Sequence, residues 1–86
     1  MKLVFHRNFE KNYRKLQEKD KIKVQSILKQ FMQNPFLASL KNHALQGKLF
    51  GKRAISVKSN LRIIFEEFDG YLIVLLLDVG THNQVY

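Results

Sequence analysis

The segment YLIVLLLDVGTHNQVY, residues 71–86, limits the folds that this chain can adopt. It begins with seven apolar residues in succession, from Tyr71 to Leu77, and most of them are Ile, Val or Leu. Such a run predicts a strand that is buried on both faces and lies inside a sheet. The strand is expected to end near Gly80, which places His82 and Tyr86 just beyond it. Strand ends commonly carry functional side chains.

The length of 86 residues suits one core, so residues 1–86 are expected to form a single domain. The chain has no cysteine, which excludes disulfides and thiolate metal sites. The histidine and carboxylate spacings match no metal-ligand pattern, so neither metal nor cofactor is expected. No apolar run reaches the roughly 18 to 20 residues of a membrane span, and the N-terminal segment lacks the apolar core of a signal peptide. We therefore expect a soluble, cytoplasmic protein.

The net charge of +8 is distributed unevenly along the chain. Residues 21–65 carry nine basic side chains and no acidic one, whereas residues 66–86 carry four acidic side chains and no basic one. A basic tract of this kind indicates a polyanionic partner, with nucleic acid as the first choice. An anionic membrane, an acidic protein or a merely solubilising surface are the alternatives.

Helical periodicity follows a short strand at residues 2–6. Asn8 is expected to cap a helix that ends near residue 18 or 19, and Asp20 a second helix that stops before Pro35. His6 lies outside every motif and is expected to be structural. The apolar positions of the two helices recur at spacings of three and four: Phe9, Tyr13 and Leu16, then Val24, Ile27, Leu28, Phe31 and Met32.

Alternation replaces helical periodicity after Gly47 and predicts strands at residues 53–58 and 61–67. A three-residue loop between them would pair core residues with core residues. The expected opposite pairs are Val57 with Leu61, Ile55 with Ile63, and Ser56 with Arg62. The pair Asp69-Gly70 suits a two-residue type I′ turn, which would set Phe65 against Val74 and Ile63 against Leu76.

These elements predict an α+β fold of order β-α-α-β-β-β, with a helical hairpin on one face of a mainly antiparallel, twisted sheet. Ile64, Ile73 and Leu75 would then form an apolar surface on the other face. A loop or another protein must cover that surface.

Several short motifs carry a resemblance to a known family. They are His43-Ala44-Leu45-Gln46-Gly47, Gly51-Lys52-Arg53, Leu61-Arg62-Ile63-Ile64-Phe65, and Gly80-Thr81-His82 with Tyr86 four residues beyond. Over essentially its whole length the chain resembles the RelE/ParE toxins, most closely the YafQ-like branch. The resemblance implies a bacterial type II toxin that enters the ribosomal A site and cleaves mRNA without metal. It also implies a cognate antitoxin, contacts with rRNA, and operator DNA bound only through the antitoxin complex.

The same resemblance implies the site residues. His43 and His82 match the family's motif histidines and would transfer protons, with His43 as base and His82 as acid or the reverse. Arg62 would hold the phosphate, and Tyr86 would stack on a base or relay a proton. The RNA-binding residues would be Lys48, Lys52, Arg53 and Lys58, whose role requires charge more than geometry.

The sequence departs from the branch at two positions. Relatives typically carry a histidine and an aspartate where this chain has Ser56 and Asn60, and neither of these can act as a general base at neutral pH. The site would therefore depend on His43, His82 and Arg62 more than the sites of its relatives do.

Other interpretations of the same residues stay open. In a purely structural interpretation, Arg62 pairs with Glu66 instead of holding a phosphate, and Tyr86 fills the core instead of contacting RNA. A gyrase-directed toxin of the ParE kind would share the fold but need no nuclease centre. A catalytically inactive module that binds the antitoxin is the third possibility.

Overall fold

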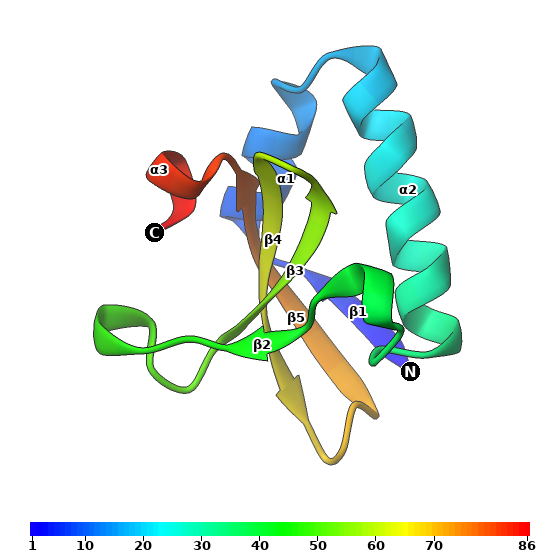
Figure 1. Ribbon diagram of the computed structural model, residues 1–86, viewed down its shortest axis with the longest axis vertical. Helices are drawn as coiled ribbons and strands as arrows, with labels where there is room; N and C mark the ends of the chain where they lie inside the picture. The colour runs from blue at the N-terminus through cyan, green and yellow to red at the C-terminus, as the bar shows by residue number, and fades with distance from the viewer.

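A five-stranded sheet organises the molecule, with strand order β1-β5-β4-β3-β2 (Figure 1). The computed structural model describes residues 1–86. Neighbouring strands of the sheet are antiparallel, except for β1 and β5, which are parallel. The elements in chain order are β1 (Lys2–Phe5), α1 (Arg7–Arg14), α2 (Glu18–Gln33), η1 (Ala38–Leu40), β2 (His43–Ala44), η2 (Gly47–Leu49), β3 (Arg53–Lys58), β4 (Leu61–Phe68), β5 (Ile73–Gly80) and α3 (His82–Val85). The predicted α+β class, with two helices followed by an antiparallel hairpin series, is confirmed.

The predicted interior strand, β5, lies between β1 and β4. Its burial differs from the prediction, because only one face is fully buried. Val74, Leu76 and Val79 are buried, whereas Leu75 and Leu77 are half-buried. The long helices cover one face of the sheet only, so the alternate residues of an almost entirely apolar strand stay partly accessible.

Both helices begin earlier than predicted. His6, not Asn8, caps α1, and its Nδ1 accepts a hydrogen bond from the Asn8 backbone N–H at 3.0 Å. His6 is therefore structural, as expected. The N-cap position of α2 is Gln17, whose side chain makes no capping hydrogen bond. Asp20 lies in the first turn of the helix, and its carboxylate binds the Lys58 ammonium at 2.8 Å. The predicted end of α2 before Pro35 is confirmed. None of the helices combines the length and the apolar character that a membrane-spanning segment needs.

The main core lies between the helices and the sheet. Phe31 of α2 is fully buried, and its ring packs edge to face with that of Phe65 of β4, with the two ring centroids 5.0 Å apart. Burying one such side chain contributes roughly 1.5 to 3 kcal/mol. The core comprises Phe9, Val24, Ile27, Phe31, Leu40, Ile55, Val57, Leu61, Ile63, Phe65, Val74, Leu76 and Val79.

The β3–β4 register confirms part of the prediction. Ile55 faces Ile63 and Ser56 faces Arg62, but Leu61 faces Lys58 instead of Val57. Val57 is the extra residue of a β-bulge. The bulge keeps Val57 and Leu61 both in the core, which a regular ladder with a two-residue turn would not allow.

The predicted two-residue turn between β4 and β5 is wrong. Four residues, 69–72, connect Phe68 to Ile73, and Asp69, Gly70 and Tyr71 all have positive φ. Phe65 consequently faces Leu76 rather than Val74, and Ile63 faces Val79 rather than Leu76. The longer turn lets the Tyr71 ring pack against Phe31 and Phe65, at centroid distances of 6.1 Å each.

The open face of the sheet, opposite α1 and α2, has its own small core of Leu45, Ala54 and Ile64. Leu49 of η2, Leu77 of β5 and Val85 of α3 pack against it. The expected cover for this face is therefore supplied in part by the chain itself, through the loop between β2 and β3 and through α3.

Candidate functional site

The sheet register places His43 and Arg62 on the open face. His43 of β2 lies opposite Ala54, and Ala54 lies opposite Ile64, so all three side chains share that face. Arg62 precedes Ile64 by two residues and therefore points the same way. It lies between Ser56 on one neighbouring strand and Gly80 on the other.

The His43 ring is exposed, and one hydrogen bond fixes its tautomer. Its Nδ1 lies 2.8 Å from the backbone carbonyl oxygen of Lys41. A carbonyl oxygen only accepts, so Nδ1 carries the proton and donates it. The neutral ring then has its free lone pair on Nε2, the atom suited to accept a proton from a substrate.

The Arg62 guanidinium is half-buried and held from one side. Its Nη1 donates to Ser56 Oγ and to the Lys58 carbonyl oxygen, both at 3.2 Å. Arg62 makes no ion pair with Glu66; the ion pair in the structure joins Lys58 to Asp20. Its Nε and Nη2 donors have no protein partner and can receive an anion.

Helix α3 carries the other two predicted catalytic residues. The His82 and Tyr86 rings meet edge to face, with centroids 4.2 Å apart and an interplanar angle of 73°. The Gln84 side chain accepts a hydrogen bond from the Thr81 backbone N–H at 2.8 Å and fixes the first turn of α3. Tyr86 is 42% exposed and does not fill the core.

Tyr86 also connects α3 to the segment that follows His43. It lines a cavity of about 330 Å³ together with Ala44, Leu45, Gln46, Lys48 and Leu49. No side-chain hydrogen bond joins any two of His43, Arg62, His82 and Tyr86. His82 and Tyr86 are connected by their ring contact and by a hydrogen bond of 3.0 Å from the Tyr86 backbone N–H to the His82 carbonyl. Only Tyr86 of the four lines a cavity, so the structure does not bring them together in one closed pocket.

The four predicted RNA-binding residues differ in how free they are. Lys58 is paired with Asp20. Arg53 donates through Nε to Asn42 Oδ1 at 2.8 Å, and Asn42 in turn binds the Pro35 carbonyl and the Tyr71 hydroxyl. Lys48 and Lys52 form no side-chain hydrogen bond or ion pair in the structure, so their charges are available to a ligand.

Sequence reasoning missed the role of Ser56 as a hydrogen-bond acceptor for Arg62. The predicted register already set the two residues opposite each other, and that pairing was the signal. No group of three or more His, Asp and Glu side chains is arranged to hold a metal ion.

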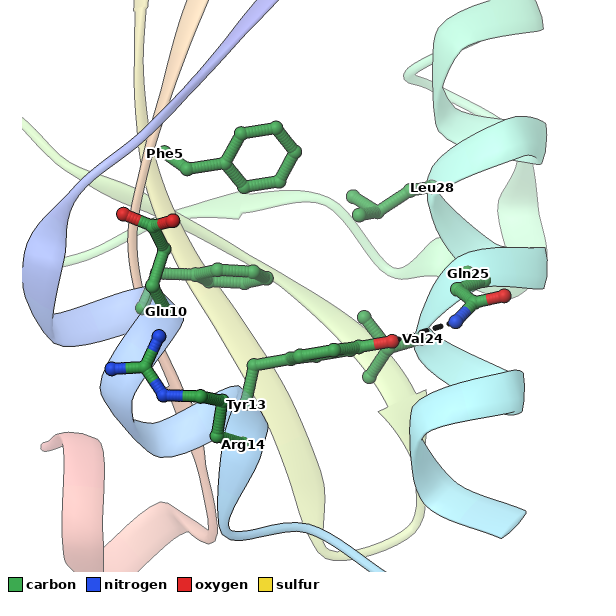
Figure 2. Close-up of a pocket in the computed structure, with 8 residues that line it drawn as sticks. Phe5, Glu10, Tyr13, Arg14, Val24, Gln25 and Leu28 are labelled. Carbon is green, nitrogen blue, oxygen red and sulfur yellow. Dashed lines mark hydrogen bonds between the residues drawn. The ribbon is translucent and has the colours of Figure 1, made fainter. Parts of the chain in front are cut away.

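The largest cavity, about 360 Å³, contains none of the predicted site residues. It lies between α1 and α2, where Tyr13 accepts a hydrogen bond from Gln25 Nε2 at 2.7 Å across the gap (Figure 2). Its walls are mainly apolar. Phe9 stacks on Tyr13 at a centroid distance of 6.1 Å and Phe5 packs on Phe9 at 5.6 Å, while Val24 and Leu28 line the α2 side. This apolar lining is better suited to binding an apolar peptide segment than to catalysis.

Comparison with known families gives one match over the whole chain. The family model described as "Bacterial toxin of type II toxin-antitoxin system, YafQ" matches residues 1–86. A comparison with curated protein sequences returned no match.

Solved structures share the fold. YafQ from E. coli strain BL21(DE3) has a TM-score of 0.83 at 22% identity, covering 98% of this chain and 96% of its own. The E. coli DinJ–YafQ toxin–antitoxin complex contains a chain with a TM-score of 0.80 at 22% identity, covering 98% and 94%. A YoeB/ParE toxin from Agrobacterium tumefaciens has a TM-score of 0.78 at 16% identity, covering 95% and 99%.

Proposed function

The chain belongs to the YafQ family of bacterial type II toxins, and from this we propose that it is a ribosome-dependent mRNA endoribonuclease. The observation that carries the proposal is the half-buried Arg62 guanidinium on the open face of the sheet. Two of its nitrogens are free for a phosphate, and histidines lie on elements to either side, in β2 and α3.

The proposed reaction is attack by the ribose 2′-oxygen on the adjacent phosphorus. The O2′–P bond forms while the P–O5′ bond breaks, and the products are a 2′,3′-cyclic phosphate and a 5′-hydroxyl. One proton leaves the 2′-hydroxyl and one is delivered to the 5′-oxygen, so a base and an acid are required. Each proton-transfer role typically contributes roughly 10² to 10⁴ in rate.

We assign the base to His43 because its Lys41 hydrogen bond leaves Nε2 unprotonated in the neutral ring. His82 is then the acid, and its ring contact with Tyr86 restricts its orientation. Arg62 would neutralise the charge that accumulates on the phosphate oxygens in the transition state. Tyr86, with its ring partly exposed, would stack on a neighbouring base.

An open site of this kind supports dependence on the ribosome. The cavity beside Tyr86 is lined by none of His43, Arg62 and His82, so no pocket of the protein holds the substrate against all the proposed catalytic side chains. Alignment of the mRNA must then come from the ribosomal A site, and correct alignment is among the largest contributions to catalysis. Lys48 and Lys52 would bind phosphates of mRNA or rRNA.

The proposed protein partner is a cognate antitoxin, through which the complex would bind operator DNA. The α1–α2 cavity supports this assignment, because an amphipathic segment could bury apolar side chains against Phe5, Tyr13 and Leu28. Glu10 and Arg14 at its edge would bind charged residues of either sign on that segment.

The deciding experiment compares the wild-type chain with His82→Ala during induction in cells. Growth is followed, and mRNA 5′ ends are mapped on translated and untranslated copies of one transcript. Growth arrest with cuts confined to the translated copy, both lost in His82→Ala, is the expected result. Asn83→Ala, an exposed neighbour on the same helix, serves as the matched control and should behave as wild type. Arrest without cuts, unchanged by the substitution, would contradict the proposal and point to gyrase or another target.

A further inference from the structure

Phe50 is the most exposed large hydrophobic residue of the chain, with 75% of its surface accessible. It belongs to the β2–β3 loop, residues 45–52, which extends away from the body of the molecule on the same side as the C terminus (Figure 1). Neither hydrophobic core includes Phe50. The fold therefore does not use this ring.

Backbone hydrogen bonds hold Phe50 in its exposed position. Its N–H donates to the Gly47 carbonyl at 3.1 Å, and the Lys52 N–H donates to the Leu49 carbonyl at 2.9 Å. Gly51 supplies a φ of +92°, which a residue with a side chain rarely adopts. Leu49 points inward and packs on the open-face core, so the next residue is directed outward. The loop is an ordered platform for one aromatic ring.

The charge around the ring selects the ligand. Lys48 and Lys52 flank Phe50 in the loop, and both are free of protein partners. Glu67 lines the adjacent cavity, but its carboxylate already accepts a hydrogen bond from the Tyr71 backbone N–H at 3.0 Å. Phe50 and Lys52 line the same cavity, and Lys48 lies two residues before the ring in the loop. This combination fits an unpaired nucleotide, whose base stacks on the ring while its phosphates meet the ammonium groups.

We propose that Phe50 is a base-stacking residue that binds an unpaired nucleotide of RNA, with Lys48 and Lys52 on the flanking phosphates. Lys48 and Leu49 share the cavity of Tyr86, so this nucleotide would lie beside the site that carries the chemistry. Naming RNA as the ligand rests on the proposed function. The binding itself does not require cleavage.

The test measures equilibrium binding to ribosomes that hold a labelled mRNA with an empty, 2′-O-methylated A-site codon, which cannot be cut. Stacking requires an aromatic ring, so Phe50→Trp should bind at least as tightly as wild type. Phe50→Leu and Phe50→Ala should both bind roughly five- to a hundredfold more weakly, the fold-change that corresponds to one stacked base. Phe36→Ala is the control: it removes a ring that is 60% exposed in the connector after α2, and it should leave binding unchanged.

A second arm locates the nucleotide. Each residue of the A-site region is replaced in turn by an abasic one, and wild type is compared with Phe50→Ala. One abasic position should remove the difference between the two proteins, because the base that stacks on Phe50 is then missing.

The outcomes separate this inference from the proposed function. Wild-type affinity in Phe50→Ala, alongside normal cleavage by the wild-type chain, would overturn the inference alone. Aromatic-dependent binding without any cleavage would support the inference and refute the nuclease. Phe50→Leu that binds RNA like wild type, with antitoxin binding lost in Phe50→Ala, would overturn it in favour of protein docking. A wild-type chain that binds no programmed ribosome would contradict both.

Discussion

Ser56 determines where the Arg62 guanidinium points. Its Oγ accepts from Arg62 Nη1 at 3.2 Å, and the Lys58 carbonyl accepts from the same nitrogen. Ser56→Ala removes one of these acceptors without creating a large cavity. The guanidinium then loses part of its orientation, and a hydrogen bond to a charged group contributes about 1.5 to 3 kcal/mol. We expect the rate of single-turnover cleavage on programmed ribosomes to fall roughly ten- to a hundredfold, with KM nearly unchanged.

Two further variants separate positioning from a structural role. Ser56→Thr keeps the hydroxyl and should retain most of the activity. Arg62→Lys should lose more activity than Ser56→Ala, because a single ammonium cannot replace the guanidinium fork. Adding Ser56→Ala to Arg62→Lys should cost little more. Additive losses, or an equal fall in the unfolding temperature of both Ser56 variants, would show that Ser56 acts elsewhere.

Single residues were predictable from sequence where a local pattern identifies them. Alternation along β3 and β4 set Ser56 opposite Arg62, and the structure confirms the pair. The capture of Lys58 by Asp20 was not predictable, because the two residues belong to distant elements that only tertiary packing brings together. The site assignments of His43, His82 and Tyr86 came from motif resemblance, and they stay predictions until variants are tested.

At the scale of elements, Gly80 controls how closely α3 approaches the sheet. A Cβ at this position would lie 2.8 Å from Gln84 Oε1 and 3.1 Å from Val85 Cγ1. Gly80→Ala should therefore displace α3, and with it His82 and Tyr86. Since a displacement of about 1 Å can cost a hundredfold in rate, cleavage should fall roughly ten- to a hundredfold.

The unfolding temperature measured on the same Gly80→Ala protein should change little, because α3 supplies only Val85 to the packing of the open face. Full activity in Gly80→Ala would show that α3 tolerates displacement or does not carry the acid.

The elements themselves were predictable to different degrees. Period-two and helical patterns located β3, β4 and α2, but the predicted two-residue turn between β4 and β5 was wrong. Asp69-Gly70 is a typical type I′ pair, and a local rule cannot anticipate that Tyr71 would adopt a φ of 70° to place its ring against Phe31 and Phe65. The register differs from the prediction by two residues at Phe65 and, beyond a β-bulge, by three at Ile63. Both observed pairs still join core residues, so the predicted core survived the error.

The whole molecule was predictable from the order of its elements, since a short strand, a helical hairpin and three further strands leave few ways to bury one core. The cover of the open face was less predictable. Leu45, Leu49 and Val85 lie in irregular segments or a short helix, where no periodicity identifies a buried side.

The uneven charge of the whole chain leads to a prediction about salt. Binding to programmed ribosomes should weaken steeply as salt rises, because each phosphate contact releases counterions, with a log–log slope of about 0.7 per contact on single strands. Lys48→Gln and Lys52→Gln should each reduce that slope by roughly one contact's share, since both ammonium groups are free. Lys58→Gln should change it less, because the Lys58 ammonium is paired with Asp20 at 2.8 Å.

Asp20→Asn provides the converse test, because it removes the partner of Lys58 while keeping the size of the side chain. The Asp20 side chain is 17% exposed and that of Lys58 is 40% exposed, so the freed ammonium can reach a phosphate in solution. Affinity and salt slope should then rise together, and adding Lys58→Gln should cancel both increases. Equal decreases for the three lysine variants, with an increase of the same size for Asp20→Asn, would show that the attraction comes from net charge alone. The pattern expected here instead assigns it to the free lysines of the β2–β3 loop.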